Sequence, residues 1–238
     1  MSSVNPIIVA LDVESAAEAL SLVNRIDVSA NFYKVGMELY AAEGPSIVRE
    51  LLARGKDVFL DLKFYDIGET VKRAVAQVAR LGVRFLTVHA SKAVMEAAVA
   101  GRGDSNLKLL AVTVLTSVDQ KDLEDDGYAL AVADLVALRV RNAMAAGIDG
   151  IVASPLEAAS IRAVTGARAI LVTPGVRSAS AGHGDQKRVA TPAEAIAAGA
   201  NHIVVGRQIT RAADPSAAAR AILDEVAPAD RPAPRDSL

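Results

Sequence analysis

The chain repeats one pattern three times, as Leu81-Gly82-Val83-Arg84-Phe85-Leu86-Thr87-Val88-His89, Ala146-Gly147-Ile148-Asp149-Gly150-Ile151-Val152-Ala153-Ser154 and Ala198-Gly199-Ala200-Asn201-His202-Ile203-Val204-Val205-Gly206. In each copy an alanine-rich helical stretch ends on a glycine, which suits the left-handed position that follows many helices. A short apolar strand comes directly after the glycine. The repeated unit is therefore a helix followed by a strand.

Five more apolar, β-branched segments predict strands and bring their number to eight, at residues 7–11, 32–37, 58–63, 109–115 and 170–173. Such nearly continuous apolar strands are buried on both faces, as in a parallel sheet covered by helices. Helical patterns lie between them, at residues 16–25, 45–54, 70–81, 129–146 and 192–198. This order, in a chain somewhat shorter than the ~250 residues typical of the fold, favours an α/β fold of the (β/α)8 TIM-barrel type. An open doubly wound sheet is the alternative.

The first 225 or so residues contain no segment that reads as a linker between domains. We therefore expect residues 1–227 to form a single catalytic barrel domain. Residues 228–238 are rich in Pro, Asp and Arg and poor in apolar side chains, which predicts a disordered C-terminal tail.

Composition narrows the possible partners. A net charge of −2 with mixed signs offers no broad basic surface for nucleic acid. The chain has no cysteine, so disulfides, thiolate metal sites and a cysteine nucleophile are excluded, and a reducing cytoplasm is the expected location. The N-terminal apolar run is short and is interrupted by Asp12, so we expect neither a signal peptide nor a membrane span.

The stretch Asp61-Leu62-Lys63-Phe64-Tyr65-Asp66 places a lysine between two carboxylates after an apolar strand. Residues two apart in a strand share a face, so Asp61 and Lys63 should point the same way, with Asp66 in the loop beyond. Nearby carboxylates favour a protonated lysine, which suits a proton donor better than an amine nucleophile. Taken alone, the motif also fits a surface cluster of ion pairs.

The other predicted strands also end in polar residues, which matters because barrel enzymes build their active sites there. These residues are Asp12, Lys34, His89, Thr116, Ser117, Ser154, Arg177 and Arg207. After the last two strands, Gly175 with Arg177 and Gly206 with Arg207 indicate where a phosphate would bind, since glycine allows close approach and arginine matches phosphate oxygens. The loop between them, residues 178–186, has the composition of a lid or of an ordinary flexible loop, and Gln186 at its end is a candidate ligand contact.

The chain resembles the orotidine 5′-phosphate decarboxylase family from about Ile7 to Arg211. The first motif is Asp61-Leu62-Lys63-Phe64-Tyr65-Asp66-Ile67-Gly68-Glu69-Thr70-Val71, in which Tyr65, Gly68 and Glu69 replace the family's histidine, proline and asparagine. The second is Gly175-Val176-Arg177 followed by Asp185-Gln186-Lys187-Arg188. Shorter matches are Leu11-Asp12, Lys34-Val35-Gly36, Leu115-Thr116-Ser117 and Val205-Gly206-Arg207.

The resemblance implies loss of CO₂ from orotidine 5′-phosphate without metal or other cofactor, giving uridine 5′-phosphate in pyrimidine synthesis. Lys63 would protonate C6 of the pyrimidine and Asp61 would face the substrate carboxylate. Lys34 and Asp12 would hold ribose hydroxyls and the network of charges. Asp66 and Thr70 would reach into the site from the other subunit of a homodimer. The remaining contacts would come from Thr116 and Ser117 at the pyrimidine and from Arg177, Gln186, Gly206 and Arg207 at the phosphate.

Three other functions remain open on the same barrel. One is a magnesium-dependent decarboxylase or aldolase of sugar phosphates, in which a glutamate tends to stand where this chain has Lys34. Another is a Schiff-base aldolase, which the charged state expected for Lys63 disfavours. The third is a nucleotide-binding protein without catalysis, which would need the phosphate site but not the Asp-Lys cluster.

Overall fold

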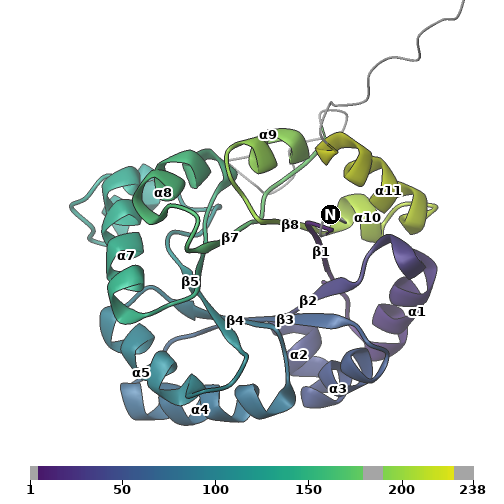
Figure 1. Ribbon diagram of the computed structural model, residues 1–238, viewed down its shortest axis with the longest axis horizontal. Coiled ribbons are helices and arrows are strands. Elements are labelled where there is room, and N and C mark those ends of the chain that lie inside the picture. Colours follow the sequence, from purple (N-terminus) through teal and green to yellow (C-terminus); the bar gives the residue numbers. More distant parts are fainter. Residues whose placement is uncertain (1–4, 179–189, 228–238) are drawn as a thin grey trace, which may run out of the picture.

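The computed structural model describes residues 5–178 and 190–227, which form a closed barrel of parallel strands surrounded by helices (Figure 1). The strands follow one another around the barrel in chain order, and β8 pairs with β1 to close it. The strands are β1 Ile7–Ala10, β2 Phe32–Gly36, β3 Asp57–Phe64, β4 Phe85–His89, β5 Lys108–Val112, β6 Gly150–Val152, β7 Ile170–Thr173 and β8 His202–Val205. The predicted (β/α)8 barrel is confirmed, and the open sheet is wrong.

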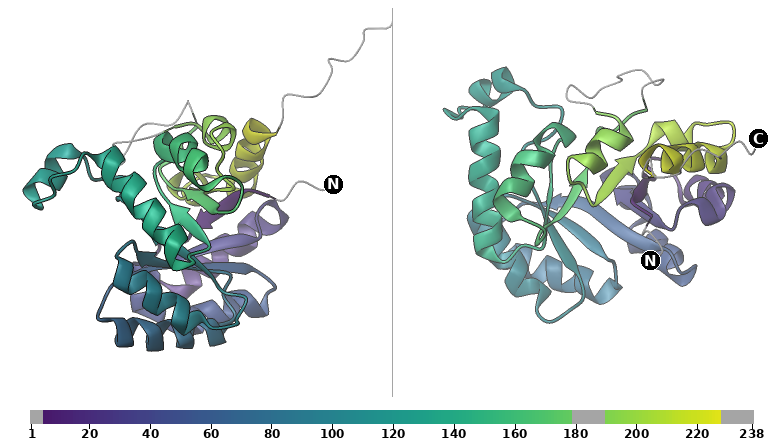
Figure 2. Two further views of the ribbon diagram at one scale, coloured as in Figure 1. Left: turned by 60° about the vertical axis from the view of Figure 1, so that its left-hand side comes forward. Right: turned by 45° about the horizontal axis from the view of Figure 1, so that its top comes forward.

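Helices connect consecutive strands and cover the outside of the barrel (Figure 1). The α-helices are α1 Ala16–Ile26, α2 Met37–Glu43, α3 Pro45–Ala53, α4 Gly68–Leu81, α5 Lys92–Arg102, α6 Gln120–Asp125, α7 Val132–Ala146, α8 Ala158–Thr165, α9 Pro192–Ala197, α10 Arg207–Thr210 and α11 Pro215–Val226. Two 3₁₀ helices are η1 Asp27–Ser29 and η2 Pro155–Glu157. In Figure 2, α6 and the start of α7 project beyond the ring of strands. In the two described parts of the chain, no helix has the length and apolar character needed to cross a membrane.

The glycines of the repeated pattern do what the sequence predicts. Gly82 ends α4 and Gly147 ends α7, with left-handed φ values of 83° and 82°. Gly199 differs slightly, because α9 is capped by Ala198 and Gly199 follows the cap with a φ of 105°. In all three copies a conformation that suits glycine turns the chain from helix to strand.

Some predicted boundaries were wrong. The strand expected at residues 109–115 ends at Val112, and the helix expected from residue 129 begins at Val132. Val114 and Leu115 leave the sheet and line a cavity instead. An apolar run alone does not distinguish a buried strand from a buried loop, and for this reason Val114 and Leu115 were predicted to belong to the strand.

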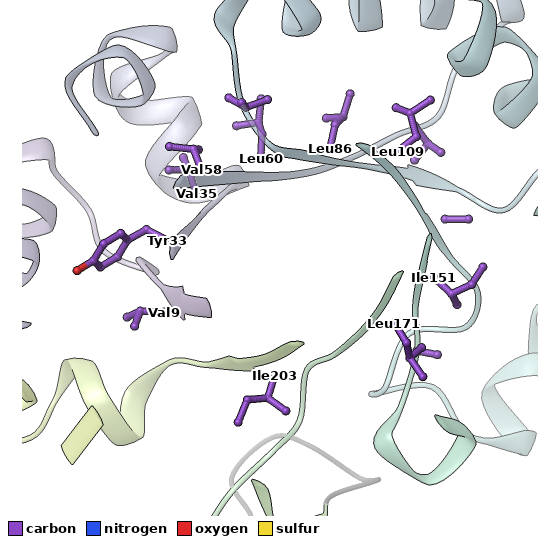
Figure 3. Packing of buried hydrophobic residues seen from close by; sticks show 14 of the residues in the cluster. Val9, Tyr33, Val35, Val58, Leu60, Leu86, Leu109, Ile151, Leu171 and Ile203 are labelled. Carbon is purple, nitrogen blue, oxygen red and sulfur yellow. The ribbon is translucent and has the colours of Figure 1, made fainter. Parts of the chain in front are cut away.

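Alternation along the strands divides the apolar core into two layers. The inner layer fills the barrel and consists of Ile8, Ala10, Phe32, Phe59, Phe85, Leu110, Val172 and Val204. The residues between them point outward and pack under the helices; Val9, Leu60, Leu86, Ile151 and Ile203 show this in Figure 3. A barrel filled in this way is a rigid support for the residues at its rim.

His202 is a titratable residue inside this packed barrel. It is the first residue of β8, is 6% exposed, and packs edge-on against Phe32 and Phe85 with ring centroids 5.6 Å apart in each case. Burial, with the positive charge of Arg84, lowers the pKa of His202 to about 4, although a hydrogen bond with the Pro6 backbone and the charge of Asp57 oppose this shift. His202 is therefore neutral in the folded protein at neutral pH.

This pKa predicts a loss of stability in acid. Between the ordinary pKa of 6.5 and the folded value of about 4, the unfolded chain binds a proton that the folded chain does not. The free energy of unfolding should therefore fall as the pH drops through this range, by on the order of 3 kcal/mol from this residue. Urea unfolding of wild type and His202→Leu between pH 4 and pH 7.5 should show a flatter pH dependence in the variant. An equal dependence in both proteins would show that His202 is not responsible.

Candidate active site

Four charged side chains, Asp12 just after β1, Lys34 on β2, and Asp61 and Lys63 on β3, form a continuous chain of ion pairs at the carboxyl end of the barrel. Lys34, on β2, donates a hydrogen bond from Nζ to Asp12 Oδ1 at 2.8 Å, and the same Nζ lies 3.8 Å from Asp61 Oδ2. On β3, Lys63 Nζ donates to Asp61 Oδ1 at 2.9 Å. The order is carboxylate, ammonium, carboxylate, ammonium, so the Asp61 carboxylate lies between two cations.

These charges are mostly withdrawn from water. The side chains of Lys34, Asp61 and Lys63 are 12%, 15% and 24% exposed, whereas Asp12 at the end of the chain of pairs is 58% exposed. Attraction between partly buried charges is screened less than attraction at an open surface. Gly36 makes room for the Lys34–Asp12 pair, because a β-carbon at Gly36 would lie only 3.0 Å from Lys34 Nζ.

A cavity of about 240 Å³ opens beside this cluster. One wall is charged and carries Lys34, Asp61 and Lys63. The rest of the wall is mainly apolar, with Thr116 and Ser117 as additional polar groups; the apolar residues are Phe59, Val112, Val114, Leu115, Val152, Ala153, Pro174 and Val204. The predicted residues Lys34, Asp61, Lys63, Thr116 and Ser117 are thus brought together around one space.

A second cavity, of about 220 Å³, adjoins the first at Lys34, Pro174 and Val204. Its polar lining includes Asp12, Arg177 and Arg207, with Gly175 and Gly206 beside the arginines. Within the described parts of the chain, the buried Nε of Arg177 has no hydrogen-bond partner. A buried donor of this kind is normally satisfied by another protein group, an ordered water or a ligand.

Hydrogen bonds hold the wall of the second cavity in place. The Ser178 amide donates to Gln208 Oε1 at 3.2 Å. The Ser178 hydroxyl accepts a hydrogen bond from Gln208 Nε2 and donates one to Glu225 of α11. Ser178 thereby ties the end of the Arg177 segment to α10 and α11. The predicted residue Gln186 lies outside the described residues, as do the rest of the loop beyond Ser178 and the tail 228–238.

Asp66 and Thr70 do not line either cavity. Asp66 is exposed in the segment just before α4, and its carboxylate accepts a hydrogen bond from the Ile67 amide at 2.6 Å. Its neighbours Tyr65 and Ile67 are large apolar side chains that are 68% and 74% exposed. Exposed apolar residues gathered in one segment are typical of a contact surface.

His89, at the end of β4, faces a separate cavity with Tyr65, Tyr128 and Arg139. Its ring lies edge-on to Tyr65, with centroids 5.5 Å apart. Burial, and to a lesser degree the charges of Arg139 and Lys63, lower the pKa of His89 below its ordinary value. Ser154, the other polar residue predicted at a strand end, caps η2 and accepts a hydrogen bond from the Leu156 amide.

The sequence did not identify Thr87 of β4, which is completely buried. Its hydroxyl donates to Asp61 Oδ1 at 2.9 Å and accepts from the Lys63 amide at the same distance. A threonine within a strand has an ordinary β-propensity explanation, so nothing in the pattern marked it. The sequence signal that could have found it is its position, two residues before His89 and on the same face of β4.

The donor set does not favour a divalent cation. Among residues 5–178 and 190–227, no group of three or more His, Cys, Asp or Glu side chains is arranged to hold a metal ion. The Lys34 ammonium contacts both the Asp12 and the Asp61 carboxylate, at 2.8 Å and 3.8 Å. A fixed cation there repels a second one.

Relatives of the chain share both its sequence and its fold. It is 55% identical over 223 residues to an orotidine 5′-phosphate decarboxylase of Rhodopseudomonas palustris (strain BisB5), covering 94% of this chain and 95% of the relative. It is 56% identical to the enzyme of that name from Methylobacterium sp. (strain 4-46), covering 94% and 96% of the two chains. The crystal structure of orotidine 5′-phosphate decarboxylase from Lactobacillus acidophilus matches with a TM-score of 0.83 at 36% identity, over 94% of this chain and all of that one.

A family model covers nearly the whole barrel. The model described as the orotidine 5′-phosphate decarboxylase / HUMPS family matches residues 5–222, which run from before β1 into α11. Both cavities and all four residues of the Asp12–Lys34–Asp61–Lys63 chain of ion pairs lie inside this match. The chain therefore belongs to the orotidine 5′-phosphate decarboxylase / HUMPS family.

Proposed function

We propose that the protein converts orotidine 5′-phosphate into uridine 5′-phosphate and CO₂, as a step of pyrimidine biosynthesis, without a metal or other cofactor. The observation that carries this proposal is the alternating Asp12–Lys34–Asp61–Lys63 chain in a cavity that adjoins an arginine-lined one. Relatives named for this activity are more than half identical over most of the chain. The same similarity supports a decarboxylase that acts on a small-molecule substrate.

The two joined cavities fit the two ends of such a nucleotide. The phosphate binds in the second cavity, where Arg177 and Arg207 supply positive charge and Gly206 permits close approach. The pyrimidine binds in the first cavity, against Thr116 and Ser117. Lys34 borders both spaces and, with Asp12, meets the ribose hydroxyls between them. Gln186 is proposed as a further phosphate-end contact on the basis of its sequence motif.

Lys63 is the proposed proton donor. When the bond between C6 and the carboxylate breaks, the electron pair stays on C6 and CO₂ leaves. The Lys63 ammonium stabilises this developing charge and then transfers a proton from Nζ to C6. The contact with Asp61 at 2.9 Å holds the Lys63 ammonium in place before reaction. Asp61 faces the position of the substrate carboxylate, and Lys34 holds Asp61 from its other oxygen.

We further propose that two subunits share each site. Asp66 and Thr70 lie outside the cavities of their own chain, and exposed Tyr65 and Ile67 flank Asp66. An isologous dimer would cover this apolar segment and bring Asp66 and Thr70 to the partner's cavity. The replacements Tyr65, Gly68 and Glu69 fall in the same segment and would shape this interface. We also propose that residues 1–227 form one catalytic domain and that the protein is located in the cytoplasm.

The alternatives differ from this proposal at particular residues. A magnesium-dependent sugar-phosphate enzyme needs a ligand where Lys34 places an ammonium 2.8 Å from Asp12. A binding protein without catalysis does not require a lysine paired with a partly buried carboxylate. A Schiff-base aldolase needs a free amine as nucleophile, whereas Lys63 Nζ is engaged with the Asp61 carboxylate.

The proposed function makes three predictions, of which the first is turnover without metal. Purified protein in EDTA should change the ultraviolet absorbance of orotidine 5′-phosphate to that of uridine 5′-phosphate, because Lys34 takes the place of a metal ion. Activity that EDTA abolishes and Mg²⁺ restores would instead favour the magnesium-dependent relatives.

The second prediction concerns Lys63. Lys63→Ala should lower kcat by about 10³-fold or more, because it removes the proton donor and the cation beside C6. Uridine 5′-phosphate should still bind in calorimetry, since the arginine-lined cavity is intact. Lys92→Ala is a matched control, because Lys92 is an exposed lysine of α5, and it should behave as wild type. Near-normal turnover by Lys63→Ala would remove Lys63 from this role.

The third prediction tests the shared site. Lys63→Ala and Asp66→Asn proteins should each be inactive alone and should recover up to about a quarter of wild-type activity when mixed, because half of the dimers are mixed and each has one intact site. If Asp66 served its own chain, both sites of a mixed dimer would be defective. No recovery after subunit exchange has been verified by mass would therefore contradict the proposal.

A further inference from the structure

The pairing of β3 with β4 is interrupted where the charged residues lie. Leu60 pairs with Leu86 and Phe64 pairs with Val88, so between these pairs β3 has three residues, 61–63, where β4 has only Thr87. The two extra residues form a bulge in the segment that contains Asp61 and Lys63. Because the excess is an even number, the alternation of faces is kept and both side chains still point into the barrel.

Lys63 has an unusual backbone within this bulge. Its φ is +48°, and in the two described segments of the chain only one other residue besides glycine, Asp27, has a positive φ. A side chain with a β-carbon is strained in this conformation and adopts it only where the surrounding structure enforces it. The interruption of the ladder also separates the Lys63 amide from a regular backbone partner on β4.

Thr87 supplies the missing interaction. It lies on β4 between the paired residues Leu86 and Val88, directly opposite the bulge, and is completely buried. Its hydroxyl oxygen accepts a hydrogen bond from the Lys63 amide at 2.9 Å. Its hydroxyl proton is then directed to Asp61 Oδ1, also at 2.9 Å. One hydroxyl therefore fixes the backbone of the lysine and the carboxylate of its partner.

The chemistry of the partners fixes the direction of both hydrogen bonds of the Thr87 hydroxyl. The Lys63 amide is a donor, so Thr87 can only accept from it, and an ionised Asp61 can only accept from Thr87. Asp61 Oδ1 then receives both the Thr87 hydroxyl and the Lys63 ammonium, while Oδ2 faces Lys34 at 3.8 Å. Without the hydroxyl, the carboxylate could rotate and the Lys63 backbone would lose its support.

We propose that Thr87 is a positioning residue of the decarboxylation: it holds Lys63 in its left-handed conformation and Asp61 in its orientation, so that the ammonium and the carboxylate are in place before the substrate binds. The proposal rests on the proposed function for its kinetic consequence. Thr87 lies behind the two reactive groups, since it contacts Asp61 and the Lys63 backbone and is absent from the lining of the cavity.

Three variants test this role kinetically. Thr87→Val keeps the shape and removes the hydroxyl, Thr87→Ser keeps the hydroxyl, and Thr113→Val makes the same change at a buried threonine of the barrel outside the cavity lining. Thr87→Val should lower kcat by about 10²-fold, because a misplacement near 1 Å has an effect of this size. Its KM and its affinity for uridine 5′-phosphate should stay within about threefold of wild type, because the binding contacts remain.

Thr87→Ser and Thr113→Val should keep a kcat within about threefold of wild type. A wild-type kcat in Thr87→Val would overturn the proposal. So would equal losses of kcat in Thr87→Val and Thr87→Ser together with lowered melting temperatures, because that result indicates a packing role for the side chain.

Crystal structures of the Thr87 variants test the positioning without any assay. In Thr87→Val, Lys63 should leave the positive-φ region or the Lys63–Asp61 contact should lengthen beyond the 4 Å limit of an ion pair, and Thr87→Ser should keep both features. An unchanged arrangement in Thr87→Val would overturn the positioning role whatever the kinetics show. Failure of wild type to convert orotidine 5′-phosphate would count against the proposed function, and the crystal structures would still decide the role of Thr87.

Discussion

The Asp61 carboxylate is bound by two ammonium groups, and the arrangement of the site depends on this interaction. Oδ1 receives Lys63 at 2.9 Å and Oδ2 faces Lys34 at 3.8 Å, with only 15% of the side chain exposed. A carboxylate so far removed from water is stable only when cations and donors compensate for the lost hydration. Each lysine therefore has a fixed partner and a fixed direction, and the cavity is built around charges that do not have to reorganise.

The barrel makes this concentration of charge possible. The inner core layer and the helices hold the strands rigidly, and every parallel strand ends at the same rim. The charges lie on β2, on β3 and just after β1, while β5, β6 and their following segments contribute apolar residues such as Val114 and Ala153 to the cavity wall. An apolar wall lowers the local dielectric, so the charges act more strongly on a bound molecule than they would in water.

Much of this arrangement could be predicted from the sequence because it depends on local patterns. The apolar strands and the glycines that end helices, such as Gly82, predict the eight-stranded barrel. The spacing of two residues between Asp61 and Lys63 predicts that their side chains share a face of the strand, and they form an ion pair. The bulge in β3 could not be predicted, because it depends on the register between two strands rather than on either strand alone. Thr87 gains its importance from that register, which is why an ordinary strand threonine did not attract attention.

The bulge also explains how a strand can present two opposite charges in contact. Residues two apart on a regular strand are held apart by the extended backbone, and long side chains there can splay toward solvent. At Lys63 the left-handed backbone interrupts that geometry, and the ammonium lies against the carboxylate two residues earlier. Such strain persists only where buried contacts enforce it. Thr87 provides such a contact from inside the barrel, because its buried hydroxyl is hydrogen-bonded to both the Lys63 amide and the Asp61 carboxylate.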